Sequence, residues 1–241
     1  MWTGNHIARN SARFDDAMPT TSPSERFGGG PDPPSPPGEA YRLGADCPEP
    51  AACEQCPCAH NGITVPWHLP DSINFPRKPT DPAWDKHLYI EDNGKFRAEL
   101  KPWEAGVLAL ELPRSNVVGW LRNVDRQPWS LEIPYESGGQ VVPMFPDLVV
   151  VPKVGDDYVF NILEPHNPAL GDNVEKAVGF AKFAEQHGAL FGRIEMLRAG
   201  TGAAGKGAFV GLDFNQTNVR KKVMLITSNP QLDALFDSDG K

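Results

Sequence analysis

The sequence predicts an α/β protein with a mixed central sheet flanked by helices and an unstructured N-terminal tail. β-branched apolar runs of strand length recur after residue 87, and two stretches with helical periodicity separate them. Most of the 25 prolines, by contrast, fall before residue 83. An order of helix, strands, helix and strand indicates an α/β sandwich.

The chain divides into three parts by composition. Residues 1–62 are rich in proline and glycine and hold too little apolar surface to offset the entropy of ordering, so we expect disorder there. Residues 63–86 should form an extended segment whose tryptophans, Trp67 and Trp84, anchor it to the folded part. The α/β domain itself is expected over residues 87–241.

Turn and capping signals place the elements of this domain. Asp92-Asn93-Gly94 is typical of a hairpin turn, Pro102 of the first residue of a helix, and Gly188 of a helix end. Strands are expected at residues 88–90, 95–98, 117–121, 131–135, 148–151, 158–163, 193–197 and 208–214. Helices are expected at residues 102–112, 170–187, 218–226 and 231–236.

Residues 144–166 carry the clearest functional signal. Two buried strands flank a Gly155-Asp156-Asp157 turn. Asp147 opens the first strand, and the polar residues Asn161, Glu164 and His166 occupy or close the second. Because one strand of a hairpin begins where the other ends, these side chains should converge, and convergent oxygen ligands suit a hard divalent cation such as Mg²⁺.

Bulk properties exclude several classes of function. The net charge of −8 and the pI of about 5.2 give no strongly basic field for nucleic acid, so DNA contact would need a local patch or a partner. The sequence has no apolar run near the ~20 residues of a membrane span and no signal-peptide core. We therefore expect a cytoplasmic protein without membrane contact.

Two further motifs match known sites only in part. Cys47, Cys53, Cys56 and Cys58 could hold Zn²⁺, but their spacing lacks two separated Cys-x-x-Cys pairs, so we expect reduced, unliganded thiols. Residues 200–206 have the spacing of a phosphate-binding loop. Gly207, however, stands where that loop needs a serine or threonine hydroxyl for Mg²⁺. A strand rather than a helix should also follow, so a flexible hairpin explains this segment better.

The motif order resembles the PD-(D/E)XK nuclease superfamily, with Pro146-Asp147 opening one strand and an acid on the next. Longer strings resemble, more narrowly, the C-terminal region of DEAD/DEAH-box helicases of the type III restriction kind. These strings lie at residues 86–89, 103–104, 118–123, 133–135, 145–147, 162–166, 187–194 and 227–236. The resemblance covers residues 64–241 and implies a restriction-endonuclease-like sandwich.

The resemblance also implies Mg²⁺-dependent phosphodiester cleavage. Asp147 and Glu164 would be catalytic ligands of Mg²⁺, and Glu104 the additional acid of the metal shell. The acid-x-Lys motif of the family lacks its lysine in this chain, where either Asn161-Ile-Leu or Glu164-Pro-His166 occupies the slot. His166 as base or ligand and Lys176 as relocated ammonium would have to compensate. The DNA partner would be presented by a helicase motor on separate sequence.

Each residue also has a structural interpretation. Asp147 can cap a turn, Glu104 can interact with a helix dipole, and Lys176 can be a solvated surface residue. The alternative hypothesis is therefore an interaction module without metal or nuclease activity, in which Trp67 and Trp84 form an exposed binding strip.

Overall fold

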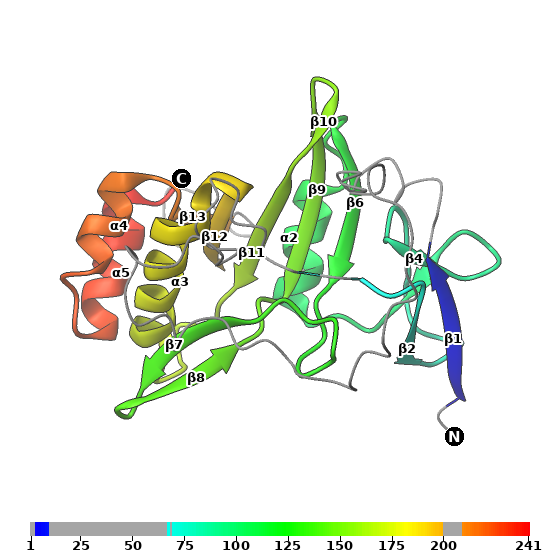
Figure 1. The fold of residues 1–241 in the computed structure, drawn as a ribbon, viewed down its shortest axis with the longest axis horizontal. Coiled ribbons are helices and arrows are strands. Elements are labelled where there is room, and N and C mark those ends of the chain that lie inside the picture. Colours follow the sequence, from blue (N-terminus) through cyan, green and yellow to red (C-terminus); the bar gives the residue numbers. More distant parts are fainter. Residues whose placement is uncertain (1–2, 10–66, 68, 200–208) are drawn as a thin grey trace, which may run out of the picture. The chain divides into compact units, whose positions relative to one another are not determined.

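The computed structural model, which describes residues 3–9, 67, 69–199 and 209–241, contains a mixed sheet flanked by helices (Figure 1). Its main strands follow the order β6, β9, β11, β12, β13, and the short β10 (Asp157–Tyr158) pairs with the end of β9. Their bounds are Val117–Arg122, Leu148–Val154, Phe160–Pro165, Phe191–Ala199 and Phe209–Asp213. The predicted fold class is confirmed.

Strand β9 is an interior strand of this sheet, antiparallel to both β6 and β11. Strand β11 runs parallel to β12, and α3 (Asn173–His187) makes the crossover between them. The register places Leu148 opposite both Arg122 and Leu163. The start of β9 therefore lies between the ends of β6 and β11.

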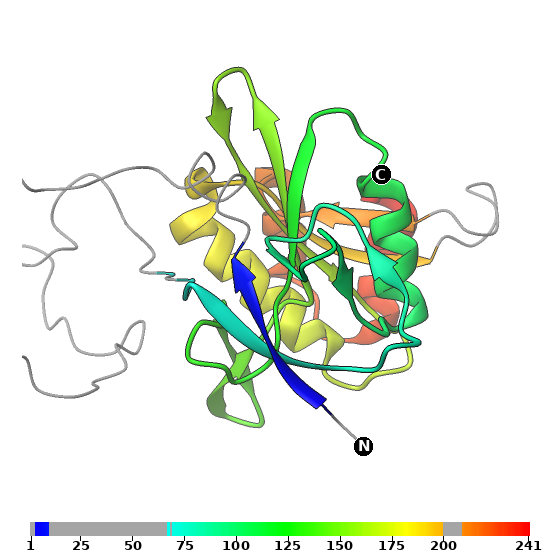
Figure 2. The same ribbon diagram turned by 90° about the vertical axis from the view of Figure 1, so that its right-hand side faces the viewer.

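Burial explains why β9 is a continuous apolar run rather than an alternating one. Leu148, Val149, Val150 and Val151 are all fully buried. Figure 2 shows α2 (Pro102–Glu111) and α3 on opposite faces of the sheet, so both faces of a central strand are covered.

Both long helices follow the predicted start and stop signals with one difference. Pro102 is the first residue of α2, and the Lys86 ammonium donates hydrogen bonds of 2.8 Å to the carbonyls of Leu112 and Val117 just beyond the helix. Gly188 ends α3 as predicted, but its φ of −57° needs no glycine. A Cβ there would lie 2.5 Å from Oδ1 of Asn215, so space, not backbone conformation, requires the glycine.

Strands β7 (Ile133–Ser137) and β8 (Gln140–Met144) form a separate hairpin over α3. Gly138 and Gly139, with φ of 58° and 77°, form its turn, as the Gly-Gly signal predicts. Pro134 lies directly opposite Pro143 in the ladder.

The N-terminal strands pair differently from the sequence prediction. The Asp92-Asn93-Gly94 turn is present, with Gly94 at φ 75°, but β4 (Tyr89–Ile90) and β5 (Phe96–Arg97) do not form a hairpin ladder. Strand β5 pairs with β3 (Ala83–Trp84) instead. Strand β4 pairs with β1 (Thr3–Arg9), which also pairs with β2 (Ser72–Arg77).

Residues 3–9 thus form a strand within the stretch predicted to be disordered. The rest of 1–62, including the cysteine cluster, lies outside the described residues, as does most of the glycine-rich segment after Ala199. Ala199 and Phe209 are opposite each other in the β12–β13 ladder, so that segment does connect two antiparallel strands.

Trp67 and Trp84 do not form the exposed strip of the alternative hypothesis. The Trp67 indole donates to the Trp129 carbonyl at 2.9 Å, and the Trp84 indole donates to the Ala98 carbonyl at 3.0 Å. Both rings are partly buried against the core. They are anchors, because each indole N–H needs a partner once its ring leaves water.

Two terminal helices, α4 (Thr217–Val223) and α5 (Asn229–Asp239), pack with α3. Arg198 of β12 pairs with Asp233 at 2.8 Å and with Asp237, while its guanidinium lies 4.7 Å from the centre of the Phe236 ring. No helix within the described ranges is both long enough and apolar enough to traverse a membrane.

Gly179 allows α3 to approach β7, so Gly179→Ala should destabilise the fold. A Cβ would lie 2.4 Å from Cβ and 3.3 Å from Cα of Tyr135, and the backbone would have to move. We expect a loss of about 1–2 kcal/mol in urea denaturation, after the helix-propensity gain of alanine. Gly171→Ala, which meets no atom within 4 Å, is the matched control and should change little. Equal losses of stability in the Gly179→Ala and Gly171→Ala proteins would contradict the packing argument.

Candidate functional site

The start of β9 and the end of β11 bring two predicted site residues together. The Asp147 backbone N–H donates a 2.8 Å hydrogen bond to Oε2 of Glu164. This contact follows from the register, since the preceding pair is Leu148 opposite Leu163. The convergence expected from the hairpin pattern is therefore present in the structure.

A cavity of about 590 Å³ opens at this end of the sheet. Its lining includes four carboxyl groups, from the predicted residues Glu104, Asp147 and Glu164 and from Asp125. The same cavity is lined by three cationic side chains, which are Lys101, Arg126 and Lys176. His166 also lines it, whereas Asn161 does not and so lies apart from the predicted cluster. All five predicted site residues thus border one cavity.

Arg122, at the end of β6, links two of the carboxylates. Its guanidinium pairs with Oε1 of Glu104 at 3.1 Å and with Oδ1 of Asp147 at 3.1 Å. It also donates to the backbone carbonyls of Asn123 and Asp147, at 2.9 and 3.1 Å. Arg122 does not itself line the cavity, so it holds the two carboxylates from behind.

Glu104 occupies the helix-start position of its structural interpretation, and its role as a metal ligand stays a prediction. It stands in the first turn of α2, where its Oε2 accepts a 3.2 Å hydrogen bond from the Lys101 backbone N–H. Its side chain is only 2% exposed. Burial raises the pKa of Glu104, Arg122 opposes that rise, and the charge of Asp147 adds to it.

Glu164 is the most perturbed acid of the cavity. Burial and the adjacent Asp147 charge raise its pKa to about 8, although the Asp147 N–H partly stabilises the ionised form. At pH 7 the Glu164 carboxyl therefore holds a proton. A buried acid with a strongly raised pKa in a cavity is characteristic of sites that bind cations or transfer protons.

Lys176 is oriented toward this site by α3. Its ammonium pairs with Asp172 at 3.1 Å, and Asp172 also accepts a 3.2 Å hydrogen bond from the Tyr135 hydroxyl. Burial lowers the pKa of Lys176, but Asp172 and Glu164 outweigh it and the net shift is upward. Lys176 thus stays charged beside the carboxylates, rather than being a fully solvated residue.

His166 lies at the edge of the cavity, but its nitrogens are enclosed. The residue is 5% exposed, neither ring nitrogen has a hydrogen-bond partner, and the ring stacks on Phe236 at a 5.5 Å centroid distance. Burial lowers the pKa of His166; Asn173 partly offsets this, although no hydrogen bond of normal geometry joins them. Its role as base or ligand stays a prediction.

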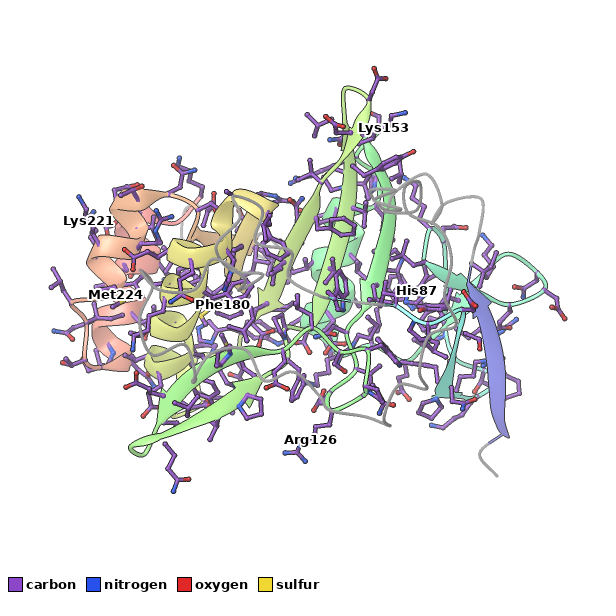
Figure 3. All side chains as sticks on the ribbon, in the orientation of Figure 1. His87, Arg126, Lys153, Phe180, Lys221 and Met224 are labelled. Carbon is purple, nitrogen blue, oxygen red and sulfur yellow. The ribbon has the colours of Figure 1, made fainter. Side chains whose placement is uncertain are left out.

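His87, labelled in Figure 3, is fully buried and contacts the backbone of Arg122. Its Nε2 lies 3.2 Å from the Arg122 backbone nitrogen, and its Nδ1 lies 2.8 Å from the Tyr89 carbonyl oxygen and 3.0 Å from the Tyr89 backbone nitrogen. The ring stacks on Phe96 with centroids 3.5 Å apart. Burial lowers the pKa of His87 to about 3, so the ring stays neutral at physiological pH.

Mg²⁺ matches this donor set in chemistry but not in arrangement. Three carboxylates are the hard oxygen ligands that Mg²⁺ prefers. Across the described residues, however, no three acidic, imidazole or thiolate side chains are grouped closely enough to hold an ion. Arg122 engages one oxygen each of Glu104 and Asp147. Metal binding would need those side chains to turn toward the cavity.

Sequence reasoning named Lys176 but missed the other cationic side chains at the site, Arg122, Lys101 and Arg126. Arg122 ends a buried apolar strand. Because a buried charge is costly unless it is paired, an arginine at that position indicates an acidic partner nearby. Lys101 and Arg126 carried no comparable signal. Arg126 sits in a turn with φ 56° and points away from the body of the protein (Figure 3).

Comparison with known proteins identifies the family. A model of the YagJ family matches residues 85–241, which include the whole central sheet and all residues of the site. The chain belongs to the YagJ family. Protein YagJ of Escherichia coli (strain K12) is 30% identical over 143 residues, which cover 59% of this chain and 57% of that relative. No solved structure matches.

The YagJ assignment corrects both resemblances, to the PD-(D/E)XK nuclease superfamily and to the type III restriction helicases. The resemblance to type III restriction helicases is wrong, and with it the assignments of helicase, restriction system and endonuclease, because the match is to a different family. The strings that suggested it are short. Such strings reflect shared local structure and can recur in unrelated proteins.

Stability should fall with rising pH because of Glu164. Its pKa is raised from 4.5 to about 8 on folding, so the folded protein binds the proton more tightly. The stabilisation is complete below pH 4.5 and is lost as pH rises through 8, on the order of 2–4 kcal/mol. Urea melts between pH 5 and 9 measure this loss.

Glu164→Gln imitates the protonated acid and should flatten that dependence. Glu132→Gln, at an exposed glutamate, is the control and should keep the wild-type profile. A Glu164→Gln protein with an unchanged pH profile would show that another group causes the slope.

Proposed function

We propose that this YagJ-family protein binds a phosphodiester segment of DNA in the cavity, with Mg²⁺ bridging the phosphate and the carboxylates. The observation that carries the proposal is the convergence of Glu104, Asp147, Glu164 and Lys176 on one cavity. These acids come from α2, β9 and β11, and the lysine from α3.

The charges of the cavity support a cation beside the phosphate and the carboxylates. A phosphate brought close to Asp147 and Glu104 meets like charge, which is costly at low dielectric. A divalent cation between them reverses the sign of that interaction. Mg²⁺ commonly binds through one or two carboxylates plus phosphate oxygens and retained water, so the site need not be a complete protein cage.

The cationic side chains would contact phosphate directly. Lys176 lies beside Glu164 and remains charged, while Lys101 and Arg126 are exposed at the cavity. Three cations give a local patch on a chain of net charge −8, which agrees with DNA contact confined to one region. Binding of this kind should weaken as salt increases.

A metal-free interaction module is the second candidate, and Arg122 is the observation that favours it. Arg122 already neutralises Glu104 and Asp147 through its two ion pairs. The acids would then be structural, and Mg²⁺ would add nothing to binding. The two candidates differ in whether Mg²⁺ changes the affinity for DNA.

The proposal predicts that Mg²⁺ strengthens DNA binding at least tenfold and that Asp147→Asn removes this gain. Asparagine keeps the shape and the backbone N–H to Glu164 but lacks the charge. Fluorescence anisotropy with a labelled oligonucleotide, in Mg²⁺ or in EDTA, measures the gain, and calorimetry measures Mg²⁺ uptake. Lys176→Met should weaken binding under both conditions, because its contact is to phosphate.

Asp156→Asn, at an exposed acid of the β9–β10 turn, is the matched control and should keep the wild-type gain. Equal affinity of the wild type in Mg²⁺ and EDTA, without calorimetric uptake, would support the metal-free module. Plasmid incubated with Mg²⁺ in parallel shows whether bound DNA is also cut.

A further inference from the structure

Strand β1 comes first in the sequence but lies in the middle of its sheet. It is the middle strand of three, between β2 and β4, although about 60 residues separate its last residue from β2 (Figures 1 and 2). Thr3 to Ala8 pair antiparallel with β2, and Ala8 and Arg9 pair antiparallel with β4. In the ladders of this sheet, β2 and β4 both pair with β1 and not with each other.

The two outer strands have their own contacts with the core. In β2, Ile73 is 3% exposed and the Phe75 ring packs on Phe96 with centroids 4.9 Å apart. In β4, Tyr89 is fully buried and its hydroxyl donates to the Pro70 carbonyl at 2.7 Å. Neighbours of a middle strand are about 10 Å apart, so at Ala8, the residue of β1 that is paired on both sides, the two anchored strands leave a slot one strand wide.

The family boundary falls across this sheet. The YagJ-family match begins at residue 85, so β4 lies inside the matched region while β1 and β2 precede it. The outer strand β2 continues directly into that region, whereas β1 arrives from far along the chain. A strand joined through a long connection behaves as a tethered ligand. The connection keeps its effective concentration near the binding site high.

We propose that the slot between β2 and β4 is an acceptor for an extended peptide, and that residues 3–9 are its tethered occupant. The ligand class is a peptide segment in β conformation that runs antiparallel to both neighbours. Main-chain hydrogen bonds supply the affinity, as in other cases of strand addition. A partner segment of this kind would displace β1 while β2 and β4 keep their core contacts.

Ala8 is the position at which the slot is most sensitive. It lies opposite Ser72 on one side and Ile90 on the other, so it belongs to both ladders. Proline lacks the N–H and fits poorly within a strand paired on both edges. Ala8→Pro should therefore release β1 without altering β2 or β4.

The test adds a labelled peptide of residues 1–12 to full-length protein. The Ala8→Pro protein should bind it with micromolar affinity in fluorescence anisotropy. The wild type and the control Ala17→Pro, which lies outside β1, should bind at least tenfold more weakly because their own β1 fills the slot. A peptide carrying the same proline should not bind the vacated slot.

Two outcomes would overturn the proposal. One is an Ala8→Pro protein that keeps its wild-type melting profile but binds no peptide. The other comes from hydrogen exchange of the wild type, which does not depend on the variant folding. The β1 amides should exchange through a local opening, faster than the amides of β9. Exchange of β1 and β9 amides together, through global unfolding only, would show that β1 is not separable.

Discussion

The Arg122 guanidinium is the contact on which the arrangement of the cavity depends. It joins Glu104 of α2 to Asp147 at the start of β9, and its backbone is fixed by His87. Without that charge, three carboxyl groups would share one partly enclosed space with only Lys176 and the rim cations to oppose their repulsion. Removing a charge from water is costly unless the charge is paired. The ion pairs with Arg122 therefore fix the positions of Glu104 and Asp147.

This arrangement gives the acids of the cavity different partners. Arg122 stabilises charge on Glu104 and Asp147, whereas Glu164 receives one N–H and faces the Asp147 charge. Glu164 therefore stays protonated at neutral pH. A cation entering the cavity would lower the pKa of Glu164, and cation binding and proton release would then be linked.

Residues with strong local signals were predictable from sequence, and those defined by distant contacts were not. Strand β9, the hairpin turns and the convergence of Asp147 with Glu164 follow from periodicity, glycine placement and register. The pairing of β4 with β1 spans most of the N-terminal region and leaves no local trace. Arg122 was missed as a site residue because its two partners lie on other elements, 18 and 25 residues away.

The opposed prolines of the β7–β8 hairpin affect how the protein meets other molecules. Pro134 and Pro143 face each other across the ladder, so neither donates to its partner, and both nitrogens point toward the outer edges of the ribbon. Each edge thus lacks a donor at the same level of the hairpin. The exposed Val141 lies on one of these edges, next to Gln140 at the turn. The exposed edges of a hairpin can pair with strands of other molecules. The two prolines make such intermolecular pairing unfavourable here.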